Sequence, residues 1–91
     1  MKLDNLSAAK GNSKGEINLQ WDSVENAVSY VIEYSNSNNT ENLKWKILDI
    51  VFDSRYTVKN LKSNKNYFFR ILSVDEKGST ETSSNILKKA P

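Results

Sequence analysis

Carboxylate side chains are the best candidates for catalysis in this 91-residue chain, because it contains neither histidine nor cysteine. Hydrolysis by paired carboxylates needs two acids that face one cleft. The acids considered for that role are Glu16, Glu25, Glu33 and Glu41. They fall on expected loops or outward strand positions, and a serine nucleophile would lack both a histidine base and a lysine partner in a pocket. The sequence therefore predicts no catalytic residues and no enzymatic activity.

Asp49, Asp53 and Asp75 are the acids that could bind calcium, an ion that prefers oxygen ligands. They are scattered along the chain and do not form the D-x-D-x-D-G pattern of an EF-hand loop. Their spacing favours solvated loop acids, with calcium binding as the alternative. The phosphate-binding patterns G-x-x-x-x-G-K and G-x-G-x-x-G are absent too. We therefore expect no cofactor and no metal.

The composition indicates one small domain with a single modest core. The net charge is +2 with both signs interspersed, so neither a nucleic-acid footprint nor a membrane patch is predicted. Lys59, Lys62 and Lys65 cluster, but a solvated turn accounts for them. No run of about 18 apolar residues and no signal-peptide pattern occurs. Frequent Asn, Ser and Lys favour a bacterial source, and Met1-Lys2 leading directly into strand-like sequence suggests a module excised from a larger protein.

Apolar and polar residues alternate with a period of two in several short segments, which is typical of half-buried strands. The seven predicted strands are residues 4–8, 16–21, 29–35, 44–48, 54–58, 67–74 and 79–87. The residues expected to face inward are Leu6, Ala8, Ile17, Leu19, Trp21, Tyr30, Ile32, Tyr34, Tyr56, Val58, Tyr67, Phe69, Ile71 and Ser73. No segment carries a helical apolar stripe. Seven short strands at this spacing predict an all-β, seven-stranded antiparallel immunoglobulin-like sandwich.

Four residues carry a resemblance to a known family. Tyr67 opens the sixth strand just after a turn and follows Leu61 by six residues, which is the pattern of a tyrosine corner. Trp21 lies on the second strand and Tyr30 on the third, whereas immunoglobulin domains place their core Trp on the third strand beside a disulfide. With Leu61 and Tyr67, these residues make the whole chain, 1–91, resemble a bacterial fibronectin type III module. The resemblance implies sheets in the order A-B-E and C′-C-F-G.

The same resemblance makes the third and sixth strands neighbours. Alternation then directs Val31, Phe68 and Leu72 to the outer side of the C′-C-F-G sheet, with Trp45 on the adjoining edge strand. This expected apolar strip has three interpretations. Trp45 covers it, which is the favoured one; or it docks a protein or a neighbouring module; or its aromatic rings stack on a glycan.

The favoured function is a structural spacer that orients neighbouring domains of the same polypeptide. The parent would be a secreted or surface-attached bacterial protein such as a carbohydrate-active enzyme, and the module itself would be a monomer. The alternative is an adhesion module that binds a protein or glycan through the outer C′-C-F-G side, and a receptor ectodomain is a third reading. Glu33 and Arg70 interrupt the apolar strip, which favours the spacer. No direct contact with nucleic acid or membrane is expected.

Overall fold

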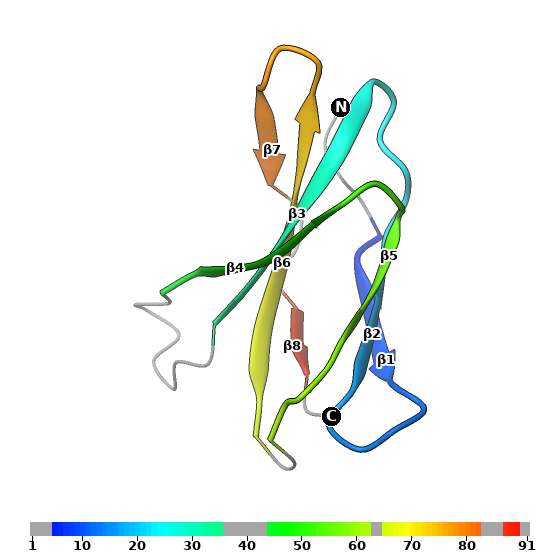
Figure 1. Ribbon diagram of the computed structural model, residues 1–91, viewed down its shortest axis with the longest axis vertical. Helices are drawn as coiled ribbons and strands as arrows, with labels where there is room; N and C mark the ends of the chain where they lie inside the picture. Colours follow the sequence, from blue (N-terminus) through cyan, green and yellow to red (C-terminus); the bar gives the residue numbers. More distant parts are fainter. Residues whose placement is uncertain (1–4, 36–43, 63–64, 83–86, 90–91) are drawn as a thin grey trace.

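The computed structural model describes residues 5–35, 44–62, 65–82 and 87–89, and all regular structure in these ranges is β-strand (Figure 1). The strands are β1 (Ser7–Lys10), β2 (Ile17–Gln20), β3 (Ala27–Ser35), β4 (Lys46–Val51), β5 (Arg55–Val58), β6 (Tyr67–Asp75), β7 (Thr80–Thr82) and β8 (Leu87–Lys89). Within the described ranges, no helix has the length and apolar character needed to cross a membrane.

Two antiparallel sheets make up the sandwich. One has the order β1-β2-β5, and the other has the order β4-β3-β6-β7, with β8 also paired to β6. The predicted immunoglobulin-like sandwich with sheets A-B-E and C′-C-F-G is confirmed. The predicted seventh strand appears as two short segments, β7 and β8, which both pair with β6.

The strand β4 differs from the prediction, which placed it at residues 44–48. In the structure it runs to Val51, and a bulge interrupts its pairing with β3. Ile32 lies opposite Asp49, and the next residue, Glu33, lies opposite Ile47, so that Leu48 is the extra residue. A bulge inserts one residue and changes the phase of the alternation. The period-two pattern therefore stops at Leu48 although the strand continues.

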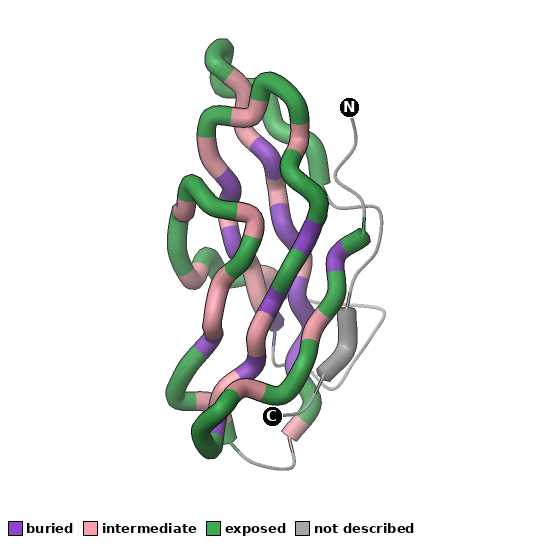
Figure 2. Tube along the Cα trace, turned by 90° about the vertical axis from the view of Figure 1, so that its right-hand side faces the viewer, coloured by how far each residue is buried: buried purple, intermediate pink, exposed green. Residues whose placement is uncertain are grey.

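The core lies between the sheets and is built from residues that alternate along the strands (Figure 2). Trp21 and Tyr30 meet there in an edge-to-face contact, with ring centroids 5.5 Å apart and ring planes at 65°. The inward residues that are buried as predicted are Leu6, Ile17, Leu19, Trp21, Tyr30, Ile32, Val58, Tyr67, Phe69, Ile71 and Ser73. Ala8, Tyr34 and Tyr56 are half-buried and pack against this core. The alternation thus identified the buried side of each sheet correctly.

The first and last strands contact each other and run in the same direction along the sandwich (Figure 1). Ser7, the first residue of β1, lies opposite Gln20 at the end of β2. Lys89, the last residue of β8, lies opposite Tyr67 at the beginning of β6. Figure 1 shows β3, which follows β2, beginning near the top of the view and β6 beginning near the bottom. The chain therefore enters β1 from the upper part of the view in Figure 1 and leaves β8 toward its bottom.

Two tyrosine hydroxyls tie loops to the core. The Tyr67 hydroxyl oxygen accepts a hydrogen bond from the backbone N–H of Lys62 at 3.0 Å, which closes the β5–β6 connection in the manner of a tyrosine corner. The Tyr30 hydroxyl accepts one from the backbone N–H of Val24 at 2.9 Å, in the β2–β3 connection. Each bond satisfies a backbone donor that the strands leave unpaired.

Candidate functional site

The outer side of the larger sheet is the candidate binding surface. The strand register brings Val31 opposite Leu72 and also opposite Ile50. Val31 and Leu72 are half-buried, whereas Ile50 is 55% exposed. Ile47, in the same strand as Ile50, is 63% exposed. Apolar surface therefore continues from β6 across β3 to the edge strand β4.

Arg70 occupies the middle of this surface and makes two interactions at once. Its Nε donates a hydrogen bond to Glu33 Oε1 at 2.6 Å, between residues that face each other in the register. Its guanidinium carbon lies 4.3 Å from the centre of the Trp45 ring, which is a cation–π contact. The exposed fraction is 27% for the Arg70 side chain and 13% for Glu33. The Trp45 ring therefore already has an occupant on one of its faces.

The position of Phe68 shows that the predicted binding strip is wrong at this residue. Phe68 was expected at the exposed surface with Val31, Trp45 and Leu72, but it is only 9% exposed and counts among the buried hydrophobic residues. Its partner in β3 is Ser35, which is also buried, at 2% exposed. Alternation predicts the side of the sheet to which a residue points, but it does not predict what covers that side. The strip as proposed from sequence therefore loses one aromatic member.

Two exposed residues of the same surface were missed from sequence. Ile47 lay within the predicted strand without being assigned to a surface, and Ile50 lay beyond its predicted end. The signal that could have found them is the run Ile47-Leu48-Asp49-Ile50-Val51-Phe52, the most apolar stretch of an otherwise polar neighbourhood. Phe52, in the turn after β4, is 79% exposed.

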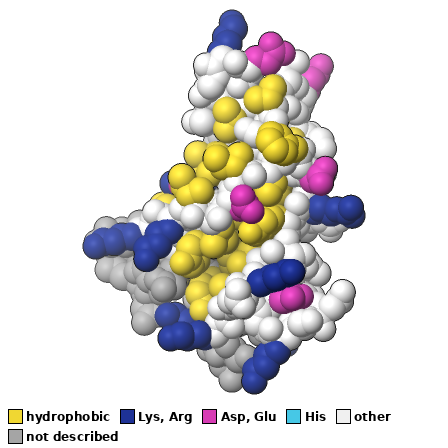
Figure 3. Space-filling model, in the orientation of Figure 1, with side chains coloured by type: hydrophobic (Ala, Val, Ile, Leu, Met, Phe, Trp, Pro, Cys, Tyr) yellow, Lys and Arg dark blue, Asp and Glu magenta, His cyan; other side chains and the backbone are white. Residues whose placement is uncertain are grey.

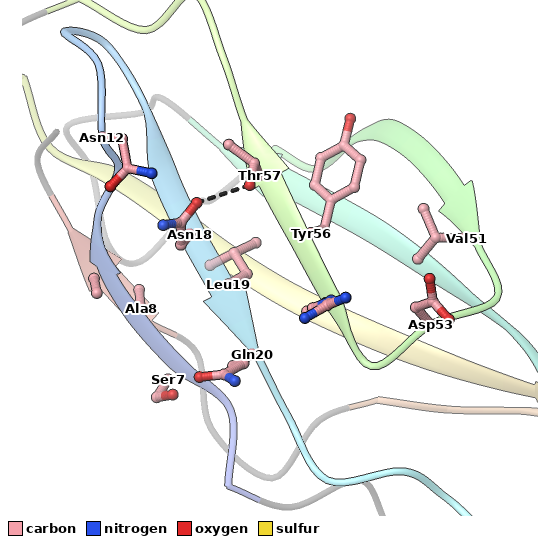
Figure 4. A pocket seen from close by; sticks show the side chains of 12 residues that line it. Ser7, Ala8, Asn12, Asn18, Leu19, Gln20, Val51, Asp53, Tyr56 and Thr57 are labelled. Carbon is pink, nitrogen blue, oxygen red and sulfur yellow. Dashed lines mark hydrogen bonds between the residues drawn. The ribbon is translucent and has the colours of Figure 1, made fainter.

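The smaller sheet bears a hollow of about 740 Å³ on its outer side (Figure 4). It is lined by Ser7, Ala8, Ala9, Asn12, Asn18, Leu19, Gln20, Val51, Asp53, Arg55, Tyr56 and Thr57. Asn18 Oδ1 accepts a hydrogen bond from Thr57 Oγ1 at 2.7 Å across its floor. Asp53 is the single carboxylate among these lining residues, so the hollow does not offer the two acids that carboxylate hydrolysis needs.

The three aspartates considered for calcium have separate places. Asp75 Oδ1 accepts hydrogen bonds from the backbone N–H groups of Lys77 and Ser79, both at 2.9 Å, and so shapes the β6–β7 turn. Asp49 lies on β4 beside the Tyr56 hydroxyl, and Asp53 lies in the β4–β5 turn. Within the described ranges, no three acidic side chains gather as a metal site would require.

The hydroxyl of Tyr56 has a shifted pKa. Burial raises the pKa of its hydroxyl, and the negative charge of Asp49 and a hydrogen bond to that carboxylate raise it further. In the unfolded chain the pKa of a tyrosine hydroxyl is about 10. The raised pKa therefore adds to the free energy of unfolding fully below that pH, and this added stability is lost as the pH rises through the pKa of the folded protein.

We expect the Tyr56 ring resonances to titrate above pH 10 in an NMR titration. Asp49→Asn should bring the pKa part of the way down, because the effect of burial remains when the charge is removed. The variant Tyr56→Phe identifies the Tyr56 ring resonances, because they disappear from its spectrum. A Tyr56 titration at or below pH 10, or one unaffected by Asp49→Asn, would contradict the proposed contact.

The comparisons with known proteins agree with this architecture. The family model described as "Fibronectin type III domain" matches residues 2–89. Curated protein sequences give no match to the chain.

Among solved structures, a Fn3-like protein from Clostridium thermocellum has a TM-score of 0.81 and 20% sequence identity, over 98% of this chain and 91% of that one. Pectate lyase PelI from Erwinia chrysanthemi has a TM-score of 0.81 and 12% identity. The match covers 98% of this chain but 28% of the lyase. Domains from titin match with a TM-score of 0.80 and 19% identity, over 98% of this chain and 31% of that one.

These identities establish likeness of fold alone. In the pectate lyase and in titin, the matching region is one part of a longer chain. The family model extends over nearly all of the sequence, and the strand order and the Tyr67 hydrogen bond agree with it. The chain belongs to the fibronectin type III domain family.

Proposed function

We propose that the chain is a non-catalytic spacer that orients neighbouring domains of a secreted or surface-attached bacterial protein, with a carbohydrate-active enzyme as the parent. The chain enters β1 and leaves β8 in the same direction along the sandwich, so domains joined before β1 and after β8 would lie toward different ends of it. The longest dimension of the molecule is 38 Å. Similar folds form part of pectate lyase and titin chains, which supports a modular role.

The observation that carries the proposal is the packing of Arg70 on Trp45. A sugar-stacking platform needs an aromatic face that is free for the ligand. Here the guanidinium lies 4.3 Å from the ring centre and is itself held by Glu33 at 2.6 Å. A glycan would have to displace a charged group that already has two partners, or use the other face of the ring.

A binding module is the second candidate, and the exposure of β4 favours it. Ile47 and Ile50 present apolar surface beside Trp45, and Trp and Arg are common at the energetic centres of protein interfaces. A protein or another domain, rather than a glycan, would suit such a surface because it could cover the isoleucines together with the ring.

An NMR titration with soluble glycans tests the spacer against a glycan-binding module. We expect no saturable shifts at Trp45, Val31 or Leu72, because the spacer needs no ligand. Phe52→Ala is the matched control, since it removes an aromatic residue that is 79% exposed but lies in the turn after β4. Saturable binding at micromolar affinity that Trp45→Ala abolishes and Phe52→Ala preserves would overturn the spacer proposal.

A further inference from the structure

The two ends of the sandwich carry charges of opposite sign. The end formed by the β2–β3 connection and the β4–β5 and β6–β7 turns is here called the acidic pole. Its charged residues are Asp22, Glu25, Asp53, Asp75, Glu76 and Lys77. Contacts unite these loops: the backbone N–H of Trp21 donates to the carbonyl of Ser54 at 3.0 Å. Asn26 and Asp75 line a common depression. Within the described ranges, five acids and one lysine therefore lie at this end, and Arg55 directly follows the β4–β5 turn.

The other end is formed by the β1–β2 turn and the β5–β6 connection and is here called the basic pole. Its charged residues within the described ranges are Lys14, Glu16, Lys59, Lys62 and Lys65. The backbone N–H of Leu61 donates to the carbonyl of Gly15 at 3.0 Å, which holds the two loops together. In Figure 3, two acidic side chains and one basic side chain lie near the top of the molecule, and basic side chains outnumber acidic ones in the lower part. The small net charge of +2 conceals this separation.

We infer that the two poles are complementary docking surfaces, so that the basic pole of one copy of this chain meets the acidic pole of another, head to tail. Opposite charges attract in this orientation, whereas head-to-head and tail-to-tail contacts bring like charges together. Such a contact is heterologous: it uses different surfaces on the two copies and can continue along a row. The inference rests on the proposed spacer function, with the further assumption that such modules follow one another in a row within one polypeptide.

The contact is expected to be weak between free copies. Glu25, Glu76, Lys14 and Lys59 are all exposed, and exposed charge pairs contribute little individually. Screening is also strong, since the Debye length falls from about 30 Å at 0.01 M salt to about 8 Å at 0.15 M. Linking two modules raises their effective concentration to about the millimolar range, where a weak contact can still set their relative orientation.

Cysteine cross-linking tests the orientation directly, because the chain has no cysteine of its own. Ser23→Cys places a thiol at the acidic pole and Ser13→Cys places one at the basic pole, and both serines are exposed. The two variants are mixed in equal amounts in a glutathione redox buffer. One of them carries a heavy nitrogen isotope, so that the mixed dimer and the two like dimers differ in mass. We expect the ratio of mixed to like dimers to exceed the statistical ratio several-fold at 0.01 M salt and to return to that ratio at 1 M salt.

Charge reversal tests the cause. Glu25→Lys with Glu76→Lys in the Ser23→Cys chain should abolish the excess of mixed dimer. Lys14→Glu with Lys59→Glu in the Ser13→Cys partner should then restore it. Lys46→Glu with Arg55→Glu is the matched control: it changes the net charge of the Ser13→Cys chain by the same amount, but at exposed strand positions away from that pole. When this control chain is mixed with the Ser23→Cys chain that keeps Glu25 and Glu76, the excess of mixed dimer should remain.

A statistical share of mixed dimer at low salt, or a double reversal that does not restore the excess, would overturn the inference. Either result would leave the spacer proposal standing, because that proposal is tested by the glycan titration. Saturable glycan binding at Trp45 would overturn the spacer without altering the cross-linking pattern.

Discussion

Trp21→Ala is expected to lower the free energy of unfolding by about 3–5 kcal/mol, the usual cost of removing a large aromatic side chain from a packed core. Trp21 is 5% exposed and contacts the edge of Tyr30 within the cluster that joins the two sheets. Alanine would leave a cavity there that the surrounding strands cannot close completely. Urea denaturation followed by far-UV circular dichroism measures the change.

Trp45→Ala is the matched comparison for this variant. Trp45 is half-buried on the outer side of the sheet, and its principal described contact is the guanidinium of Arg70. An exposed cation–π contact contributes about 0.5–1 kcal/mol, so the loss should be much smaller than for Trp21. Equal losses in the two variants would show that one of the two rings is wrongly placed.

Tyr67→Phe is expected to lower the free energy of unfolding by about 1–3 kcal/mol while leaving the fold unchanged. The phenyl ring still fills its site in the core, where Tyr67 is 5% exposed. The hydroxyl oxygen is lost, and the backbone N–H of Lys62, which donates to it at 3.0 Å, is left without this acceptor. The site is partly buried, so water can replace the acceptor only in part.

The matched control for the corner is Tyr34→Phe. Tyr34 is a half-buried core tyrosine whose ring lies 6.4 Å from that of Tyr67. Within the described ranges, no hydroxyl hydrogen bond of Tyr34 is seen. Its removal should change the denaturation midpoint far less. A midpoint that Tyr67→Phe leaves unchanged would mean that the corner bond makes no net contribution to stability.

Much of the fold could be predicted from alternation, because a strand with one buried side must repeat its apolar residues every second position. Ile17 and Leu19 on β2 and Trp21 directly after it follow this rule, and so do Tyr67, Phe69, Ile71 and Ser73 on β6. The sheet order came from the family resemblance carried by Trp21 and Tyr67, since alternation alone does not say which strands are neighbours.

The candidate site was predicted only in part. Val31, Leu72 and Trp45 lie on or beside the outer side of the larger sheet, but Phe68 is buried there and Ile50 was missed. The bulge at Leu48 explains the miss, because one unpaired residue reverses the alternation without leaving a local mark in the sequence.

The sequence by itself determined the class of fold, the buried side of the strands whose alternation is unbroken and the absence of histidine and cysteine chemistry, because these depend on residue type and local spacing. Tertiary structure decided which residues meet across strands. Arg70 reaches both Glu33 and Trp45 only because β6, β3 and the start of β4 lie side by side. The acidic and basic poles likewise arise because loops far apart in the sequence meet at the same end of the sandwich. A sum of charges along the chain cannot show such a separation, since it contains no positions in space.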